Sequence, residues 1–160
     1  MCTTSTDSTR SDRCCSSNVA AVHILVGTDA DYVLNDIAAA LGGPDVSFTV
    51  CRNGRDVSPV VKQRTPDLVV LDLQIGSMGG MAVTMSLRLD ESSGALPHVK
   101  VLMLLDRQAD VHLAKRCAAD GYLVKPVDPL TLKRAARAIL AIPAEPSAPE
   151  SPEELPAAVG

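Results

Sequence analysis

Aromatic residues are nearly absent from this sequence. Its 160 residues include no tryptophan, and the aromatic set is Tyr32, Phe48 and Tyr122. Proteins that stack bases on side chains need aromatic platforms, so this class of nucleic-acid binder is disfavoured. Also missing is any apolar run of the roughly 18 to 20 residues that a membrane helix needs, and the first residues form no apolar signal segment. We therefore expect a soluble, cytoplasmic protein that contacts neither nucleic acid nor membrane.

The predicted domain also lacks a net charge, and the chain lacks an even number of cysteines. Residues 19–142 carry 13 acidic and 13 basic side chains, which is not the charge footprint of a DNA-binding domain. The five cysteines are odd in number, which argues against a disulfide framework. Cys14 and Cys15 have no second pair of metal ligands at a suitable spacing. Cys51 and Cys117 lie in apolar stretches and are expected in the core.

The composition divides the chain into three parts. Residues 1–18 are dominated by Ser, Thr, Cys, Asp and Arg, without periodicity. Residues 143–160 hold five of the eleven prolines and four glutamates, but no basic residue. Both segments are predicted to be disordered tails. Residues 19–142 have the length of one domain, and the apolar fraction of 46% for the whole chain is sufficient for a core.

Within that domain, short apolar runs alternate with helical patterns. Five runs rich in Val and Leu are predicted to be strands: 22–26, 46–50, 68–71, 101–105 and 122–124. After each run, apolar residues recur at spacings of three or four, as on one face of a helix. Five such alternations predict a doubly wound α/β fold, in which helices cover both faces of a parallel sheet.

Polar residues end or follow the predicted strands, where doubly wound sheets bind their ligands. Thr28 and Asp29 follow the first strand, Asp72 the third, Asp106 the fourth and Lys125 the fifth. In the strand order 2-1-3-4-5 the first and third strands are neighbours, so Asp29 and Asp72 would lie side by side with Lys125 in reach. Two adjacent carboxylates favour a divalent cation such as magnesium. A carboxylate beside such an ion and an ammonium group is suited to attack a phosphoryl group.

Three stretches resemble the receiver domain of bacterial two-component response regulators: PDLVVLDLQIGSMGG (66–80), VLMLLD (101–106) and GYLVKP (121–126). The similarity extends from about residue 22 to residue 140. It implies a flavodoxin-like (βα)5 three-layer sandwich with a five-stranded parallel sheet in the order 2-1-3-4-5. It also implies a role in a phosphorelay, in which a sensor histidine kinase or another phosphodonor passes a phosphoryl group to Asp72.

The resemblance assigns roles to further residues. Lys125 would contact the phosphoryl group on Asp72, and magnesium would be held by Asp29, Asp72 and the backbone carbonyl of Gln74. Gly80, eight residues after Asp72, fits the pattern. The bond from Lys125 to the following proline resembles the family's cis-prolyl bond.

The acidic position after the first strand departs from the family. Receivers usually have two acidic residues there, whereas this chain has Thr28 and then Asp29. Magnesium binding is therefore expected to be weakened. Asp31 is expected to be the N-cap of the first helix rather than a replacement ligand.

The switch position departs as well. Receivers carry a Ser or Thr at the end of the fourth strand, but residues 101–110 contain neither. The alignment with the family allows residue 103, 104 or 105 to occupy the Ser or Thr position, and Leu105 is taken as its equivalent. Tyr122 matches the aromatic residue that follows the missing hydroxyl. A charge-assisted hydrogen bond contributes about 1.5 to 3 kcal/mol, similar to a typical allosteric coupling, so we expect impaired switching.

We therefore expect an atypical, stand-alone receiver that acts by protein contact. No effector domain is expected after Ile142. The predicted fourth helix, fifth strand and fifth helix would form a face for a partner or a second copy, with a group of basic side chains: Lys115, Arg116, Lys133, Arg134 and Arg137. The protein would not be an enzyme, apart from phosphorylation and dephosphorylation of its own Asp72.

Two alternatives remain open. The first is a pseudo-receiver that binds a protein or a small ligand without phosphorylation, because Thr28 and the missing hydroxyl weaken the usual machinery. The second is a small haloacid-dehalogenase-type phosphohydrolase, since DADYV at 29–33 resembles that family's Asp-x-Asp segment. The three histidines are scattered and are not expected to be catalytic or metal-binding: His23, His98 and His112.

Overall fold

The structure is a computed structural model that describes residues 21–141. The predicted tails, 1–18 and 143–160, lie outside the described residues. The elements are, in chain order, β1 (Val22–Gly27), α1 (Asp31–Leu41), β2 (Val46–Cys51), α2 (Gly54–Gln63), β3 (Leu68–Asp72), α3 (Gly80–Ser92), β4 (Val101–Leu105), a 3-10 turn (Gln108–Asp110), α4 (Val111–Arg116), β5 (Gly121–Val124) and α5 (Pro129–Ala141). No helix between residues 21 and 141 combines the length and the apolar character needed to cross a membrane.

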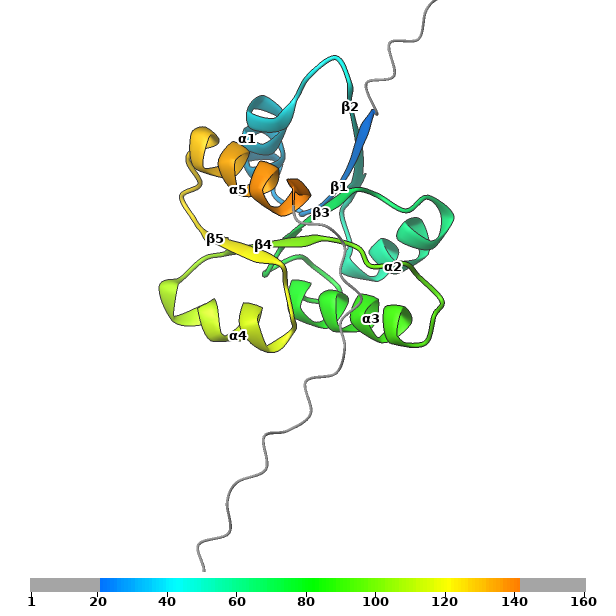
Figure 1. Cartoon of the computed structure of the whole chain (residues 1–160). Helices are drawn as coiled ribbons and strands as arrows, with labels where there is room; N and C mark the ends of the chain where they lie inside the picture. Colours follow the sequence, from blue (N-terminus) through cyan, green and yellow to red (C-terminus); the bar gives the residue numbers. More distant parts are fainter. Residues whose placement is uncertain (1–20, 142–160) are drawn as a thin grey trace, which may run out of the picture.

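All five strands are parallel and form one sheet in the order β2-β1-β3-β4-β5. Helices α1 and α5 pack side by side on one face, and α2, α3 and α4 cover the other (Figure 1). The prediction of a doubly wound three-layer sandwich is confirmed. The strand order reverses between β1 and β3, so the carboxyl ends of these two strands border the crevice where such folds bind ligands.

The central strands are apolar throughout because both of their faces are covered. All five side chains of β3 and all five of β4 are buried. Alternate residues point to opposite faces, so Leu68 and Val70 join the core under α1 and α5. Val69 and Leu71 join the core under α2 and α3. The last residue of β3, Asp72, is thereby carried into the interior, where only 2% of its surface is exposed.

Two local features bear on the predicted site. A Cβ atom on Gly80 would lie 2.5 Å from the backbone oxygen of Asp72, so the start of α3 can approach the end of β3 only without a side chain. The prediction that Asp31 caps the first helix is wrong, because Ala30 occupies the N-cap position and Asp31 is the first helical residue. Its carboxylate instead pairs with Arg52 from the loop after β2.

Candidate functional site

The carboxyl ends of β3 and β5 bring Asp72 and Lys125 into direct contact. Nζ of Lys125 lies 2.7 Å from Oδ2 of Asp72, although 53 residues separate the two in sequence. The backbone N–H of Lys125 donates to the carbonyl of Leu105 at 2.7 Å, which aligns the end of β5 with the end of β4. The peptide bond from Lys125 to Pro126 is cis, as the sequence indicated. The sheet therefore sets an ammonium group beside a buried carboxylate.

Both oxygens of Asp72 have further hydrogen-bond donors. The backbone N–H of Gln74 donates to Oδ1 at 3.2 Å, and the hydroxyl of Thr28 donates to Oδ2 at 3.3 Å. Thr28 is completely buried, and its hydroxyl oxygen also accepts a hydrogen bond from the N–H of Ala30 at 3.2 Å. Thr28 thus contacts Asp72 from the residue after β1, a position where receivers usually carry an acidic residue.

Asp106 is a site residue whose role the sequence did not reveal. Its Oδ1 lies 3.1 Å from Nζ of Lys125, so a single ammonium group bridges Asp106 and Asp72. The signal was present in the sequence, since Asp106 directly follows β4, the strand between β3 and β5. Burial alone would lower the pKa of Lys125, but hydrogen bonds and charge from the two carboxylates outweigh it and raise this pKa above its usual value.

Asp29 is exposed at the mouth of this cluster. A Cβ atom on Gly76 would lie 3.5 Å from Oδ2 of Asp29, so the carboxylate reaches over the loop that follows β3. Arg52 donates to the backbone oxygen of Asp29 at 3.2 Å and pairs through its other nitrogen with Asp31. Asp31 is thus paired with Arg52 at the surface, beside the segment that resembles the phosphohydrolase motif.

The predicted magnesium ligands are chemically suitable but few. Between residues 21 and 141, no three His, Cys, Asp or Glu side chains are grouped closely enough to hold a metal ion. Magnesium is commonly bound through one or two carboxylates with waters completing its shell. Asp29, Asp72 and the carbonyl of Gln74 fit such a shell, in which water would supply about half of the six ligands. This ligand set remains a prediction.

The predicted switch position, Leu105 on β4, is apolar and closed. Leu105 has no exposed surface and packs in a cluster with Met103, Ala114 and Cys117. Tyr122 pairs with Met103 across β4 and β5, which places its side chain on the same face as Leu105, and it is 38% exposed. Leu105 fills its position with hydrocarbon and offers no hydroxyl to a phosphoryl group on Asp72.

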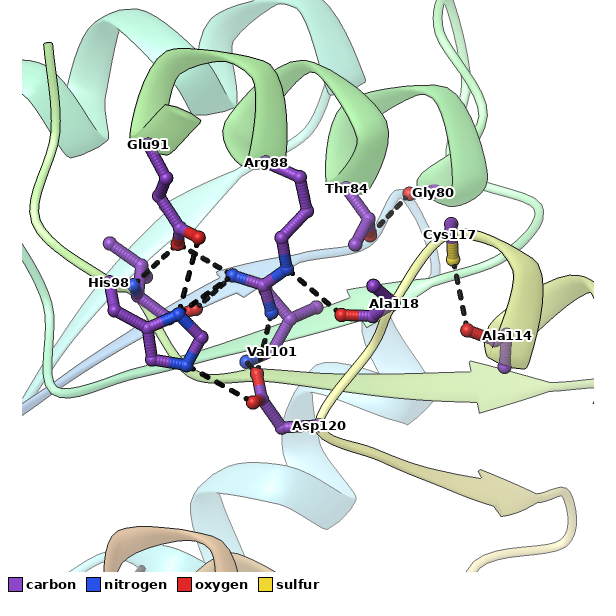
Figure 2. A network of polar contacts seen from close by, with 11 residues as sticks. Gly80, Thr84, Arg88, Glu91, His98, Val101, Ala114, Cys117, Ala118 and Asp120 are labelled. Atoms are coloured by element: carbon purple, nitrogen blue, oxygen red, sulfur yellow. Dashed lines mark hydrogen bonds and ion pairs between the residues drawn. The ribbon is translucent and has the colours of Figure 1, made fainter. Parts of the chain in front are cut away.

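The remaining cysteine and histidine predictions lie outside this cluster. Cys51 and Cys117 are buried, and burial raises the pKa of both thiols, as expected for core residues. His98 lies between Glu91 and Asp120 at the opposite end of the sheet (Figure 2). The paired Cys14 and Cys15 lie outside the described residues.

Comparisons with known proteins point to one family. A family model described as the response regulator receiver domain matches residues 24–137. PilH of Pseudomonas aeruginosa is 30% identical over 109 residues, which cover 68% of this chain and 89% of PilH. The DNA-binding response regulator MtrA of Mycobacterium tuberculosis is 32% identical over 116 residues, which cover 71% of this chain and 48% of MtrA. The chain therefore spans about half of MtrA.

Solved structures share the fold. The chemotaxis response regulator CheY4 of Vibrio cholerae superimposes with a TM-score of 0.64 at 20% identity, covering 74% of this chain and 98% of CheY4. The receiver domain of a sensor histidine kinase from Pseudomonas aeruginosa, with a magnesium ion coordinated in its active-site cleft, gives a TM-score of 0.63 at 20% identity. That match covers 76% of this chain and 98% of the other.

Proposed function

The chain belongs to the response regulator receiver family, and on that basis we propose that Asp72 accepts a phosphoryl group from a sensor histidine kinase or another phosphodonor. The contact between Asp72 and Lys125, at 2.7 Å, is the observation that supports this most directly. A carboxylate oxygen of Asp72 would form a bond to phosphorus while the bond between phosphorus and the donor breaks. The electron pair of that bond leaves with the donor, and no proton needs to be moved at Asp72.

Lys125 would provide the fixed positive charge for this transfer. Its raised pKa keeps the side chain an ammonium group at neutral pH, so it balances charge on the phosphoryl oxygens. Magnesium, when bound by Asp29, Asp72 and the carbonyl of Gln74, would supply the additional positive charge that phosphoryl transfer requires. With Thr28 in place of an acidic residue, we expect this ion to bind more weakly than at a site with three carboxylates.

We further propose that the chain acts in the cytoplasm as a stand-alone receiver, through contact with another protein or a second copy. The match to PilH covers 89% of that relative, so a receiver with little additional chain exists among similar proteins. The face formed by α4, β5 and α5 carries exposed Tyr122 and Leu130 beside the exposed basic side chains of α4. Contrary to the sequence-based expectation, Lys133 and Arg137 of α5 line a hollow with β1 and the loop before β2. Apolar side chains within a basic surround suit a partner with an acidic rim. Apart from changes at Asp72, we propose no enzymatic activity.

The central experiment is phosphorylation by a small phosphodonor such as acetyl phosphate with magnesium, read out by intact-protein mass. We expect labelling of the wild type and none of Asp72→Asn. Asp45→Asn, which removes an exposed carboxylate far from Lys125 in the fold, is the matched control and should be labelled like the wild type. Equal labelling of the wild type and Asp72→Asn, or no labelling of either with magnesium at saturating levels, would overturn the proposal.

The proposal of impaired switching depends on Leu105 and has its own test. Leu105→Thr restores a hydroxyl, and Leu105→Val has the shape of Thr without the hydroxyl. Both should lose about 2 kcal/mol of stability, because the site is fully buried. With the phosphoryl mimic beryllofluoride and magnesium, NMR shift changes should reach Tyr122 and α5 only in Leu105→Thr. Changes that already reach Tyr122 in the wild type would show that switching is intact.

A phosphorylation-independent pseudo-receiver is the second possibility, and Thr28 and Leu105 favour it. The two possibilities differ in what Asp72→Asn does to partner binding. In a phosphorylated receiver the substitution removes the effect of a phosphodonor on the partner. In a pseudo-receiver the wild type and Asp72→Asn bind the partner with the same affinity, whether or not a phosphodonor is present.

A further inference from the structure

A small, partly open hollow lies beside the phosphoacceptor cluster and is lined by residues of α1, β4 and α5. Helices α1 and α5 cover this face of the sheet (Figure 1). Its volume is about 170 Å³. The walls are apolar and come from four elements: Val33 and Ile37 of α1, Leu104 of β4, Pro126 and Val127 of the loop after β5, and Leu132 of α5. An apolar cavity of roughly 150 Å³ is large enough to hold benzene. The hollow therefore has room for one small ring or a short branched chain.

The polar side chains that line the hollow leave a negative charge unmatched. Asp36 and Tyr32 of α1 line the hollow together with Lys125. The ammonium group of Lys125 already faces the carboxylates of Asp72 and Asp106, so its charge is matched. Among the ion pairs of residues 21–141, none includes Asp36. The uncompensated charge at the rim is therefore negative, and the ring of Tyr32 adds an aromatic face that attracts cations.

We propose that this hollow binds a small organic amine: a protonated ammonium group at Asp36 and Tyr32, attached to a ring or branched chain that fills the apolar interior. An anionic ligand would face Asp36, and a neutral one would leave its charge unmatched. A ligand much larger than a single ring would extend out of the hollow into solvent. The structure thus selects for size, apolar body and positive charge at the same time.

The hollow also touches the phosphoacceptor machinery through one side chain. Lys125 lines the hollow and binds Asp72 with its ammonium group. An occupant that shifts this side chain changes its contact with Asp72, and by thermodynamic linkage a phosphoryl mimic on Asp72 changes the affinity for the amine by the same factor. This coupling rests on the proposed function of Asp72, whereas amine binding itself does not.

The test is an NMR titration of the full chain with three probes of similar shape: benzylamine, benzyl alcohol and benzoate. Benzylamine should shift the amides of Val33, Ile37, Val127 and Leu132. It should bind about tenfold more tightly than benzyl alcohol, because an ammonium group gains both an exposed ion pair and a cation–π contact. Benzoate should bind most weakly. Equal affinities for benzylamine and benzyl alcohol, or shifts that avoid these four amides, would overturn the proposal.

Matched variants separate the effect of the Asp36 charge on binding from effects on folding. Asp36 is exposed on α1, so Asp36→Asn should fold normally and weaken benzylamine by about threefold to fivefold while leaving benzyl alcohol unchanged. Asp45→Asn makes the same charge change elsewhere and should have no effect. Loss of benzylamine affinity in both variants would refute a role for Asp36. Asp72→Asn should still bind benzylamine while losing beryllofluoride, so failure of the phosphoacceptor proposal and failure of amine binding give different results.

Discussion

At the end of the sheet where the strands begin, Arg88 lies between Glu91 and Asp120 (Figure 2), whereas at the carboxyl end Lys125 alone faces Asp72 and Asp106. The first group joins α3 to the segments that lead into β4 and β5. Glu91 accepts from the N–H of Val99 at 2.7 Å, and Asp120 accepts from the N–H of Val101 at 2.7 Å. The Arg88 guanidinium also donates to two backbone carbonyls, those of Val99 and Ala118, at 2.9 Å each.

The difference between the two ends lies in how completely the charges are matched. At the amino end, two carboxylates share a guanidinium, the His98 ring and two backbone N–H groups. Such a fully bonded network holds segments together and has little capacity left for a ligand. At the carboxyl end, Asp29, Asp72 and Asp106 outnumber the single ammonium of Lys125. An excess of carboxylates favours a cation, so this end is suited to binding and chemistry.

The comparison predicts that Arg88→Met destabilises the fold more than Asp106→Asn, which changes the charge at the carboxyl end. The side chains of Arg88, Glu91 and Asp120 are 17%, 10% and 22% exposed, and the substitution leaves both carboxylates without their shared cation. We expect a loss of about 3 kcal/mol in the free energy of unfolding, measured by urea denaturation. Labelling of the folded variant by acetyl phosphate should persist.

Arg116→Met is the control for this change, because Arg116 is exposed at the end of α4. It should alter stability by no more than about 0.5 kcal/mol. Similar losses for Arg88→Met and Arg116→Met would mean that the network at the amino end contributes little, and the contrast between the two ends would fail.

The carboxyl end was the more predictable of the two from sequence. Apolar runs ending in Asp72 and Lys125 fix which residues reach that edge once the strand order is known, since the backbone carries them there. The network around Arg88 depends instead on side-chain rotamers and loop paths, because Arg88 and Asp120 are 32 positions apart in sequence. No spacing of residues in the sequence predicts such a contact. For the same reason the ion pair of Asp31 with Arg52 was missed in favour of a capping role that the local sequence suggested.

The substitution Asp106→Asn tests the excess of carboxylates at the carboxyl end of the sheet. Asp106→Asn removes one negative charge and leaves Lys125 bound to Asp72 alone. We expect beryllofluoride with magnesium to bind about threefold to fivefold more tightly. The negative charge of Asp106 no longer repels the anionic mimic, and the Lys125 ammonium group is no longer shared between two carboxylates. Stability should change by less than about 1 kcal/mol, since Asp106 is 36% exposed. Weaker binding in Asp106→Asn would instead identify Asp106 as a helper in holding the cation.

His23 on β1 is the exception to the matched charges of the amino end. Its Nε2 lies 2.8 Å from the hydroxyl oxygen of Thr49, and the residue is only 4% exposed. Burial is the main cause that lowers the pKa of His23, the charge of Arg64 lowers it further, and Asp67 opposes both. The folded state therefore favours the neutral ring. Since the unfolded chain takes up this proton more readily, the stabilising effect is present above 6.5, the ordinary pKa of a histidine, and is lost as the pH falls below that value.

His23→Gln keeps a polar group near Thr49 and removes the titration. At pH 7.5 its stability should lie within about 1 kcal/mol of the wild type, because no charge is lost there. Urea denaturation at pH 7.5, 6.5 and 5 should show the wild type losing stability toward acid more steeply than the variant. All other side chains are the same in both proteins, so the difference between the two curves isolates His23. Parallel curves would show that the amino end accommodates a proton on His23 and that no position there is held in its neutral form by burial.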